Sequence, residues 1–364
     1  MTTGKRILQI VPHVPGTLDG VGDHALRLAE ALFDEDDMRT TFLVAASTSV
    51  QEKDGFEILS GFSNESFESV APSMHHVILH YSNYGFGHRG MPFELRRFAQ
   101  RLRRSLPGKW ITMFHELYAS GPPWRSAFWT RPFQVKIARD LMDLSDACFV
   151  SNRVIGDEIR RYDSGKPVHQ VAIMSNLGEP HLTEFASRSP GCWAVCGGTK
   201  LLQRSLRTFL ERKHAIPEAF RPERLYAIGG RRDARIEDLL RENTEMPVSY
   251  HPEVSAEAAS EILEQCRFGW LDYYGAGKVW PGLIFKSATV GAYCAHGVIP
   301  VFAHEEGKII FEGDSFPGPF GVSGGNPRFP QPGEVAKIAA EIYAWYQKHA
   351  SSHHTAEVYA KALA

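Results

Sequence analysis

Short apolar runs rich in Val, Ile and Phe alternate along this chain with stretches in which apolar residues recur every three or four positions. The first pattern is typical of buried strands and the second of amphipathic helices. Strands that alternate with helices in this way form parallel sheets, because each helix carries the chain back to start the next strand. The sequence therefore predicts an α/β protein.

The alternation occurs twice, on either side of a stretch rich in Asn, Gly, Pro and Ser at 175–190. A chain of 364 residues has room for two domains of ordinary size. We therefore expect two Rossmann-like domains, at 1–180 and 181–350. Strands are predicted at 6–11, 40–44, 76–81, 110–115, 147–151, 171–174, 193–196, 224–228, 268–272 and 298–302. Helices are predicted at 22–33, 92–106, 132–144, 153–162, 201–213, 234–242, 256–265, 287–296, 334–347 and 355–363.

Charge and cysteine content exclude several classes of protein. The 40 Lys and Arg nearly balance 42 Asp and Glu, so a net charge of -2 provides no basic field for nucleic acid. The five cysteines lie mostly in apolar segments without zinc-ligand spacing and are expected to be reduced and buried. The N-terminal apolar run is too short for a signal peptide, and the uncharged stretch 287–304 contains Gly, His and Pro. These features favour a cytoplasmic location.

A glycine-containing turn follows the first predicted strand and leads into a helix. It contains Gly16, Gly20 and Gly22. The free N–H groups at the start of a helix attract anions, and a diphosphate is one such group. The G-V-G spacing is not the dinucleotide fingerprint G-x-G-x-x-G. A glycine turn without a ligand remains the alternative.

The second half repeats this pattern with added positive charge. Gly198, Thr199 and Lys200 lead from a strand into a helix, and Arg204 lies one turn later on the same face. Amides and cations that converge in this way would neutralise a diphosphate leaving group. Gly230 ends the next strand in a similar turn. The alternative is an ordinary strand–helix turn with surface cations.

A third candidate anion site opens the helix predicted at 287–296. Ser287 is a plausible N-cap beside Lys286, and Thr289 lies in the first turn. A capped helix with an exposed lysine is the alternative. The sequence contains no paired Asp cluster, H-E-x-x-H or Walker motif, so we expect no obligatory metal site and no resident cofactor.

The strand predicted at 110–115 ends in His115 and Glu116. Open α/β sheets bind their ligands at this carboxyl edge. Near neutral pH His115 could accept a proton or donate to a ligand oxygen, and Glu116 could orient it or contact an acceptor. A solvated strand end is the alternative.

Two surface features suggest a partner. Trp124 and Trp129 belong to an aromatic segment, expected to be a loop, that could stack on an acceptor sugar, touch a membrane interface or pack against its own domain. The helix predicted at 92–106 carries several arginines between Arg96 and Arg104. That face is either simply solvated or a peripheral contact with an anionic partner such as the inner face of a membrane.

The order of these motifs, with the segment Ala295-His296-Gly297-Val298-Ile299-Pro300-Val301, resembles a GT-B fold glycosyltransferase, and most nearly the retaining family four. The resemblance implies two Rossmann-like domains that face each other across a cleft, with a C-terminal helix at 351–364 that crosses back to the first. It implies a nucleotide-sugar donor held mainly by the second domain, an acceptor held by the first, and transfer without a metal. In these terms Gly20 and Gly22 approach the diphosphate, His115 contacts the reacting sugar, and Lys200 and Arg204 hold the phosphates.

One departure from the family pattern bears on activity. The family carries two glutamates eight positions apart, for the donor sugar and the ribose, and those positions hold Ile284 and Ala292 here. Neither side chain can accept a hydroxyl proton. Lys286, Ser287, Asp272 and Tyr273 lie nearby in sequence as possible substitutes.

These observations predict a metal-independent glycosyltransferase, more probably retaining than inverting. It would move a sugar from a nucleoside-diphosphate sugar to a hydroxyl of a glycan, a lipid-linked intermediate or a small molecule. Two alternatives stay open: a catalytically inactive GT-B-like accessory or binding protein, and an NAD(P)-dependent oxidoreductase, for which neither half has the required glycine fingerprint.

Overall fold

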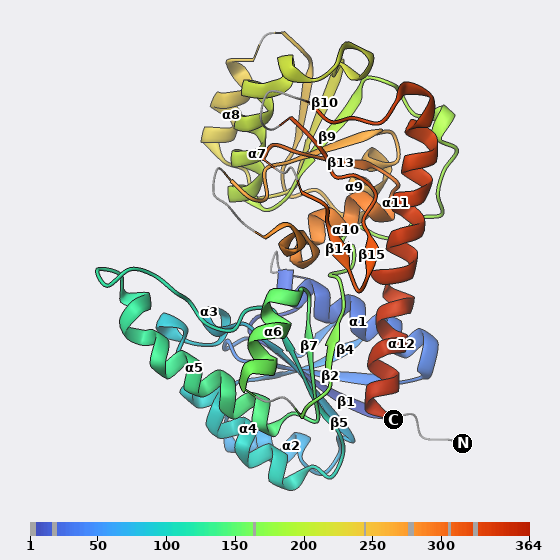
Figure 1. Cartoon of the computed structure of the whole chain (residues 1–364). Helices are drawn as coiled ribbons and strands as arrows, with labels where there is room; N and C mark the ends of the chain where they lie inside the picture. Colours follow the sequence, from blue (N-terminus) through green and yellow to red (C-terminus); the bar gives the residue numbers. More distant parts are fainter. Residues whose placement is uncertain are drawn as a thin grey trace. The chain divides into compact units, whose positions relative to one another are not determined.

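The computed structural model describes residues 5–16, 20–162, 165–243, 245–275, 280–304, 307–322 and 327–364. The chain divides into two compact units (Figure 1). Unit 1 comprises Met1–Ala172 together with Ser352–Ala364, and unit 2 comprises Ile173–Ser351. Each unit is built around its own sheet, as the double alternation of strands and helices predicts.

The sheet of unit 1 has eight strands in the order β3-β4-β2-β1-β5-β6-β7-β8. All neighbours are parallel except β3 and β4. The strands are β1 (Arg6–Val11), β2 (Arg39–Val44), β3 (Glu52–Lys53), β4 (Phe56–Ser60), β5 (His76–Tyr81), β6 (Trp110–Phe114), β7 (Ala147–Val150) and β8 (Val168–Gln170). The helices are α1 (Gly20–Asp36), α2 (Asn64–Val70), α3 (Asn83–Phe86), α4 (Phe93–Ser105), α5 (Ser126–Leu144), α6 (Arg153–Tyr162) and α12 (Ser352–Leu363).

The main sheet of unit 2 has six parallel strands in the order β11-β10-β9-β12-β13-β16. They are β9 (Cys192–Cys196), β10 (Arg224–Ile228), β11 (Val248–His251), β12 (Phe268–Leu271), β13 (Ile299–Phe302) and β16 (Phe320–Gly321), and β14 (Ile310–Phe311) pairs with β15 (Asp314–Ser315) in a separate hairpin. The helices are α7 (Thr199–Arg212), α8 (Ala234–Arg241), α9 (Ala256–Leu263), α10 (Ala288–Ala295) and α11 (Val335–His349). The predicted α/β class with two parallel sheets is confirmed.

The central strands are buried along their whole length, which explains why they read as continuous apolar runs. The helices bury only one face. In α4, for example, Leu95, Phe98, Ala99 and Leu102 point into the core of unit 1 at helical spacing. The polar faces of such helices then supply contacts that fix the edges of the sheet.

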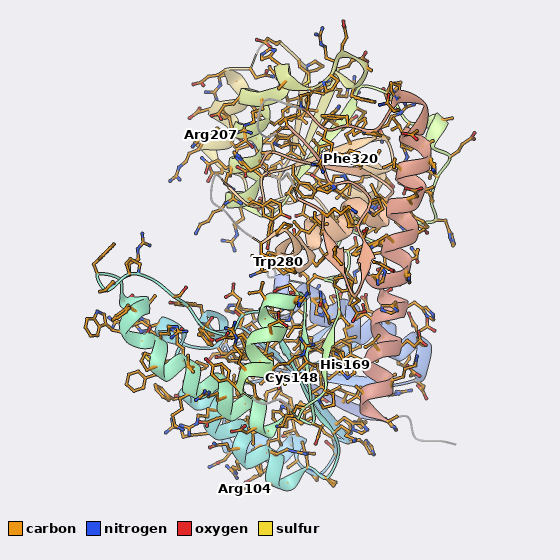
Figure 2. All side chains as sticks on the ribbon, viewed as in Figure 1. Arg104, Cys148, His169, Arg207, Trp280 and Phe320 are labelled. Carbon is orange, nitrogen blue, oxygen red and sulfur yellow. The ribbon has the colours of Figure 1, made fainter. Side chains whose placement is uncertain are left out.

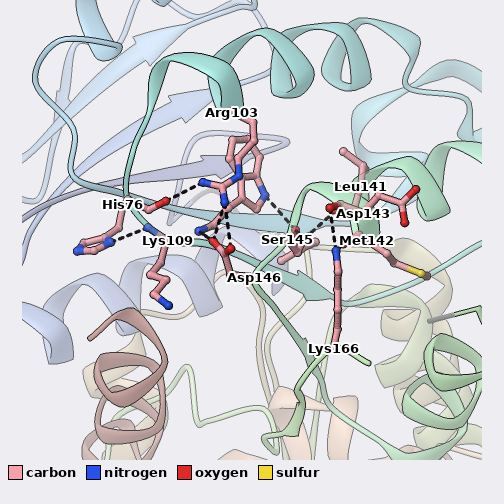
Figure 3. A network of polar contacts seen from close by, with 12 residues as sticks. His76, Arg103, Lys109, Leu141, Met142, Asp143, Ser145, Asp146 and Lys166 are labelled. Atoms are coloured by element: carbon pink, nitrogen blue, oxygen red, sulfur yellow. Dashed lines mark hydrogen bonds and ion pairs between the residues drawn. The ribbon is translucent and has the colours of Figure 1, made fainter. Parts of the chain in front are cut away.

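One of these contacts positions the start of β6 (Figure 3). The carboxylate of Asp146 accepts hydrogen bonds from the backbone N–H of Trp110 at 2.7 Å and from the guanidinium of Arg103 at 3.0 Å. Arg103 also donates to the carbonyl of Gly108 at 2.7 Å. Arg103 on α4 is therefore a structural anchor rather than a solvated cation.

In unit 2 the Tyr293 hydroxyl of α10 lies in the fully buried centre of the sheet. It accepts a hydrogen bond from the backbone N–H of Cys196 at 2.8 Å and donates to the carbonyl of Trp270 at 3.1 Å. Gly269 makes room for this ring, because a Cβ there would lie 2.6 Å from it. The hydroxyl thus links a helix to the ends of two neighbouring strands.

Two sequence predictions are wrong. No strand forms at 171–174, because the chain leaves the sheet after β8 and the N–H of Ile173 donates instead to the carbonyl of Phe285. The aromatic segment predicted as a loop is partly helical, because α5 begins at Ser126 rather than at Pro132. Proline is frequent at the first helical position. Here the helix runs through it.

The structure also bears on the expectations for the cysteines and for membrane-spanning helices. All five cysteines are free and buried, as predicted. Within the described part of the chain, no helix combines the length and the apolarity needed to cross a membrane.

We expect Tyr293→Phe to lower the free energy of unfolding by about 1–3 kcal/mol, because the buried N–H of Cys196 would lose its partner. The measurement is urea unfolding followed by circular dichroism. Tyr226→Phe is the matched control, since its exposed hydroxyl only meets Arg224 at 3.4 Å. Equal stability of the two variants would contradict the assignment.

Candidate active site

Each sheet has one point at which the strand order reverses. In unit 2 the chain runs from β9 to β10 on one side and later crosses to β12 on the other. In unit 1 it runs from β1 to β2 on one side and then to β5 on the other. Loops at the carboxyl ends of such strands diverge and leave space for a ligand. The candidate residues are therefore described by their position relative to these two points.

In unit 2, α7 begins directly after β9, and Gly198 is its N-cap. Its φ of -64° and ψ of 158° are open to any residue, and a Cβ there would meet no atom within 4 Å. The fold therefore does not require glycine at this exposed position. A bare N-cap leaves the first N–H groups of the helix open to a ligand, and the helix dipole favours an anion there.

Gly230 and Thr199 have a structural explanation instead. Gly230 has a φ of +66°, and a Cβ there would lie 2.8 Å from the backbone nitrogen of Thr199. The Thr199 hydroxyl accepts a hydrogen bond from the backbone N–H of Arg231 at 2.8 Å. The loop after β10 is thus packed against the start of α7, and it supports this helix terminus.

The two cations predicted on α7 differ in their surroundings. Lys200 is exposed in the first turn, and no described residue forms an ion pair with it. Arg204 donates from Nε to the carbonyl of Asp272 at 2.8 Å and from Nη2 to the carbonyl of Tyr273 at 3.0 Å. Arg204 therefore joins α7 to the loop after β12, across the point where the strand order reverses.

Asp272 is a buried carboxylate at that same point. It accepts a hydrogen bond from the N–H of Gly275 at 2.9 Å, and its own N–H donates to Ser205 at 3.0 Å. His304 Nε2 lies 3.8 Å from the same oxygen, Oδ1, and Arg204 Nε lies 3.7 Å from the other, Oδ2. Burial, with the nearby Arg212, lowers the pKa of His304 below its ordinary value. His304 belongs to no motif that distinguishes it in the sequence.

The start of α10 fits the structural alternative for one of its three predicted residues, the N-cap Ser287. Ser287 is buried and caps the helix by accepting from the N–H of Val290 at 3.5 Å. Lys286 and Thr289 are half-buried beside it. Ile284 and Ala292, which occupy the positions of the family glutamates, are both completely buried. Neither of these positions can present a polar group to a ligand.

In unit 1 the corresponding helix terminus belongs to α1. Gly20 is its exposed first residue, and a Cβ there would meet nothing within 4 Å. Gly22, the third residue of the helix, is buried. The preceding part of the glycine turn, residues 17–19, lies outside the described residues. As at Gly198, packing against the described residues does not require a glycine at position 20.

His115 lies directly after β6 and belongs to a cluster of three histidines. His24 of α1 and His80 of β5 complete it, and one ring nitrogen from each lies within 4.8 Å of the others. His80 Nδ1 is 3.4 Å from His115 Nε2. His80 Nε2 is 2.7 Å from the Oε1 atom of Gln9 in β1.

Burial keeps two members of this cluster, His24 and His80, electrically neutral. It lowers the pKa of His24 to about 4, and it holds the pKa of His80 well below the ordinary value, with a further contribution from His24. Both imidazoles are therefore uncharged at pH 7. Sequence analysis missed them, although a histidine and a glutamine inside otherwise apolar strands were a usable signal. Glu116 is exposed directly after His115.

The aromatic residues of unit 1 are exposed. Trp124 is 84% exposed and Trp129 67% exposed. The Trp129 indole donates to the carbonyl of Pro123 at 2.8 Å, and Phe128 meets its ring edge-on at 5.3 Å between centroids. These contacts are local and leave the ring faces open. The alternative of a loop packed against its own domain is wrong for both tryptophans.

Internal contacts occupy part of the basic face of α4. Arg96 pairs with Asp140 at 2.5 Å, and Arg101 lies over the Phe67 ring at 3.7 Å. Arg103 is held by Asp146 as described above. Arg97 and Arg104 remain exposed, and Figure 2 shows Arg104 at the outer surface of unit 1. The region 96–104 is thus less basic at its surface than its sequence suggests.

Comparisons with known proteins place the fold. No family model matches the chain, and no curated protein sequence does. Among solved structures, an alpha-glucosyltransferase in complex with UDP superposes with a TM-score of 0.63 at 11% identity, over 99% of this chain and 100% of that one. A structure described as trehalose-6-phosphate from E. coli bound with UDP-2-fluoro glucose gives 0.57 at 11% identity, over 99% of both chains. A glycosyltransferase from Rickettsia africae gives 0.58 at 12% identity, also over 99% of both.

The fold is GT-B. The GT-B fold inferred from the order of the motifs is therefore confirmed. Identities this low establish the fold alone, so the narrower likeness to retaining family four stays a prediction. Two features of this GT-B chain were not expected from its sequence. In unit 2 the arginine on α7 anchors a loop, and in unit 1 histidines gather at β5 and β6.

The two kinds of glycine give a test of the structural assignment. We expect Gly230→Ala to lower the free energy of unfolding by about 1–3 kcal/mol, because of its positive φ and the close Thr199 backbone. Gly198→Ala should cost less than about 1 kcal/mol. Thermal unfolding of both variants is the measurement. Equal losses would show that Gly198 is also required by packing.

Proposed function

We propose that this protein is a glycosyltransferase that moves a sugar from a nucleoside-diphosphate sugar to a hydroxyl acceptor. The observation that carries the proposal is the bare N-terminus of α7, where Gly198 leaves open space beside the first N–H groups. Its position after the central strand β9, at the reversal of the strand order, is where α/β folds bind nucleotides. A diphosphate fits the positive end of the helix.

The chemistry that such a site performs is electrostatic. Breaking the anomeric bond builds negative charge on the leaving diphosphate, and preorganised donors lower the barrier where that charge develops. In unit 2 these donors are the first amides of α7 and the ammonium of Lys200. Arg204 acts by holding the loop after β12 in place. No metal is needed for this charge balance.

The donor is proposed to be a UDP-sugar. The GT-B structures to which this chain is similar include complexes with UDP and with UDP-glucose. In a retaining reaction the leaving phosphate can itself take the acceptor proton. His115 and Glu116 at the end of β6 would then contact the sugar and its acceptor. Gly20 and Gly22 at the start of α1 would approach the diphosphate.

For the acceptor we propose a sugar-containing molecule. The open faces of Trp124 and Trp129 can stack on sugar rings. The similar alpha-glucosyltransferase has also been seen with DNA. This chain has a net charge of -2, so a nucleic-acid acceptor would meet no overall attraction. We place the reaction in the cytoplasm, and any contact with the inner face of a membrane through 96–104 would rely on Arg97 and Arg104.

One observation favours a second candidate, a GT-B protein that binds but does not transfer. Ile284 and Ala292 are completely buried, so the donor hydroxyls lose the carboxylates that the family resemblance supplies. Assays of the full chain with UDP-glucose and related donors separate the two candidates. Release of UDP only with an acceptor present supports transfer, and UDP binding without turnover supports the second candidate.

The donor site is tested by changing Gly198. We expect Gly198→Asp to keep the stability of the fold, because Asp is a preferred N-cap, yet to weaken UDP binding at least about tenfold by charge repulsion. Gly198→Asn has the same shape without the charge and should bind UDP more tightly than the Asp variant. Isothermal titration with UDP measures both. Unchanged affinity in the Asp variant would place the diphosphate elsewhere.

The acceptor role of the aromatic residues has a separate test. We expect Trp124→Ala to raise the KM for a glycan acceptor several-fold through loss of stacking, of about 1 kcal/mol, and to leave UDP affinity unchanged. Phe33→Ala on α1 is the control, because Phe33 is also an exposed aromatic residue of unit 1. If Trp124→Ala instead lowers only the binding of anionic lipid vesicles, the segment is a membrane contact and not an acceptor site.

A further inference from the structure

We propose that His24, His80 and His115 form a binding site for a single Zn²⁺-type metal ion. This inference goes beyond the proposed glycosyl transfer and does not depend on it. The expectation of no obligatory metal site came from the absence of a paired Asp cluster, an H-E-x-x-H motif and a Walker motif, whereas these three histidines are distant from one another in sequence. Nitrogen ligands such as imidazoles suit Zn²⁺ and related ions rather than Mg²⁺.

The spacing of the ring nitrogens supports a shared ion. One nitrogen from each histidine lies within 4.8 Å of the other two, and His80 Nδ1 is 3.4 Å from His115 Nε2. With Zn–N bonds of about 2.0–2.1 Å, tetrahedral ligands lie about 3.3–3.4 Å apart. The observed 3.4 Å separation matches that value and exceeds the usual length of an N–H hydrogen bond. His24 would need to move inward by about 1 Å.

His24 is the residue that hydrogen bonding leaves unexplained. Its side chain is 2% exposed, and neither Nδ1 nor Nε2 has a hydrogen-bond partner among the described residues. A buried polar group without a partner is costly and rare in folded proteins. Its ring meets those of His80 and His115 edge-on, at 5.6 and 5.3 Å between centroids. A metal ion in the cluster would give one of these nitrogens a partner.

The surroundings of His80 prepare it to be a ligand. Gln9 donates from Nε2 to the Thr40 hydroxyl at 3.3 Å, so its Oε1 atom is the one that faces His80 Nε2 at 2.7 Å. The oxygen can only accept, and the proton of His80 therefore lies on Nε2. That leaves the Nδ1 lone pair directed at His115. Metal-ligating histidines commonly have such an outer partner, which fixes the tautomer and the ring orientation.

The elements that carry the site are central to the fold, and one of the three histidines is partly exposed. Gln9 and His80 lie on the neighbouring central strands β1 and β5, and His24 lies on the helix that covers them. His24 and His80 are buried, whereas His115 is partly exposed at the carboxyl edge. Three protein ligands with an open fourth position are the arrangement that binds zinc together with water or another small ligand.

The test uses the full chain, freed of metal with a chelator and dialysed. We expect isothermal titration with ZnCl₂ to show one site with micromolar or tighter affinity, and MgCl₂ to show none. Co²⁺ should bind in the same place and give the visible absorption of a four-coordinate ion with nitrogen ligands. Zinc should also raise the melting temperature of the protein.

His24→Phe is the decisive variant. Because neither nitrogen of His24 is hydrogen-bonded, phenylalanine should fill the same space without loss of stability in the chelator. We expect its zinc affinity to fall at least about tenfold and the Co²⁺ spectrum to be lost. His181→Ala removes an exposed histidine of unit 2 and should bind zinc like the unaltered chain.

Two results would overturn the proposal. One is the absence of stoichiometric zinc binding to the unaltered chain. The other is binding that survives His24→Phe, which would assign the ion to surface groups. UDP titration of the metal-free chain runs in parallel. Because the UDP titration is made without metal and the zinc titration without UDP, failure of the zinc site leaves the proposed transferase standing, and the converse also holds.

Discussion

The constraint on which this structure depends is the reversal of strand order beside the first strand of each sheet. A parallel sheet needs a crossover for every pair of strands, and both units start in the centre and build outwards in two directions. The crossover after β1 therefore leads to one side of the sheet and that after β5 to the other, and the same holds for β9 and β12. The histidine cluster in unit 1 and the start of α7 in unit 2 both lie at these places.

The two units use this position differently. In the proposed donor site of unit 2 the backbone would provide binding groups, and side chains such as Arg204 and Thr199 hold the loops in place. In the proposed metal site of unit 1 buried side chains would provide them, because His24 and His80 enter the core from a helix and a strand. The first arrangement would suit a large anion and the second a small metal ion.

Much of the fold could be predicted from periodicity, and the failures have physical causes. Apolar runs identify strands such as β5 and β10 because both faces of a parallel sheet are buried. Strands β4 and β11 were missed because they lie towards the sheet edges, and most of their side chains are only half-buried. The start of α5 was misplaced because proline can be tolerated inside a helix when neighbouring contacts hold the turn.

The sequence alone determined the α/β class, the two successive series of strands and helices, and the placing of glycines and a histidine at strand ends. Each of these features depends only on residues that are close together along the chain. It could not decide which residues from different strands meet. Gln9, His24, His80 and His115 are brought together by sheet order and by burial. Tertiary structure also decided that Arg204 anchors the loop after β12 and that Gly230 is required by close packing. Both roles depend on contacts with residues that are distant in sequence.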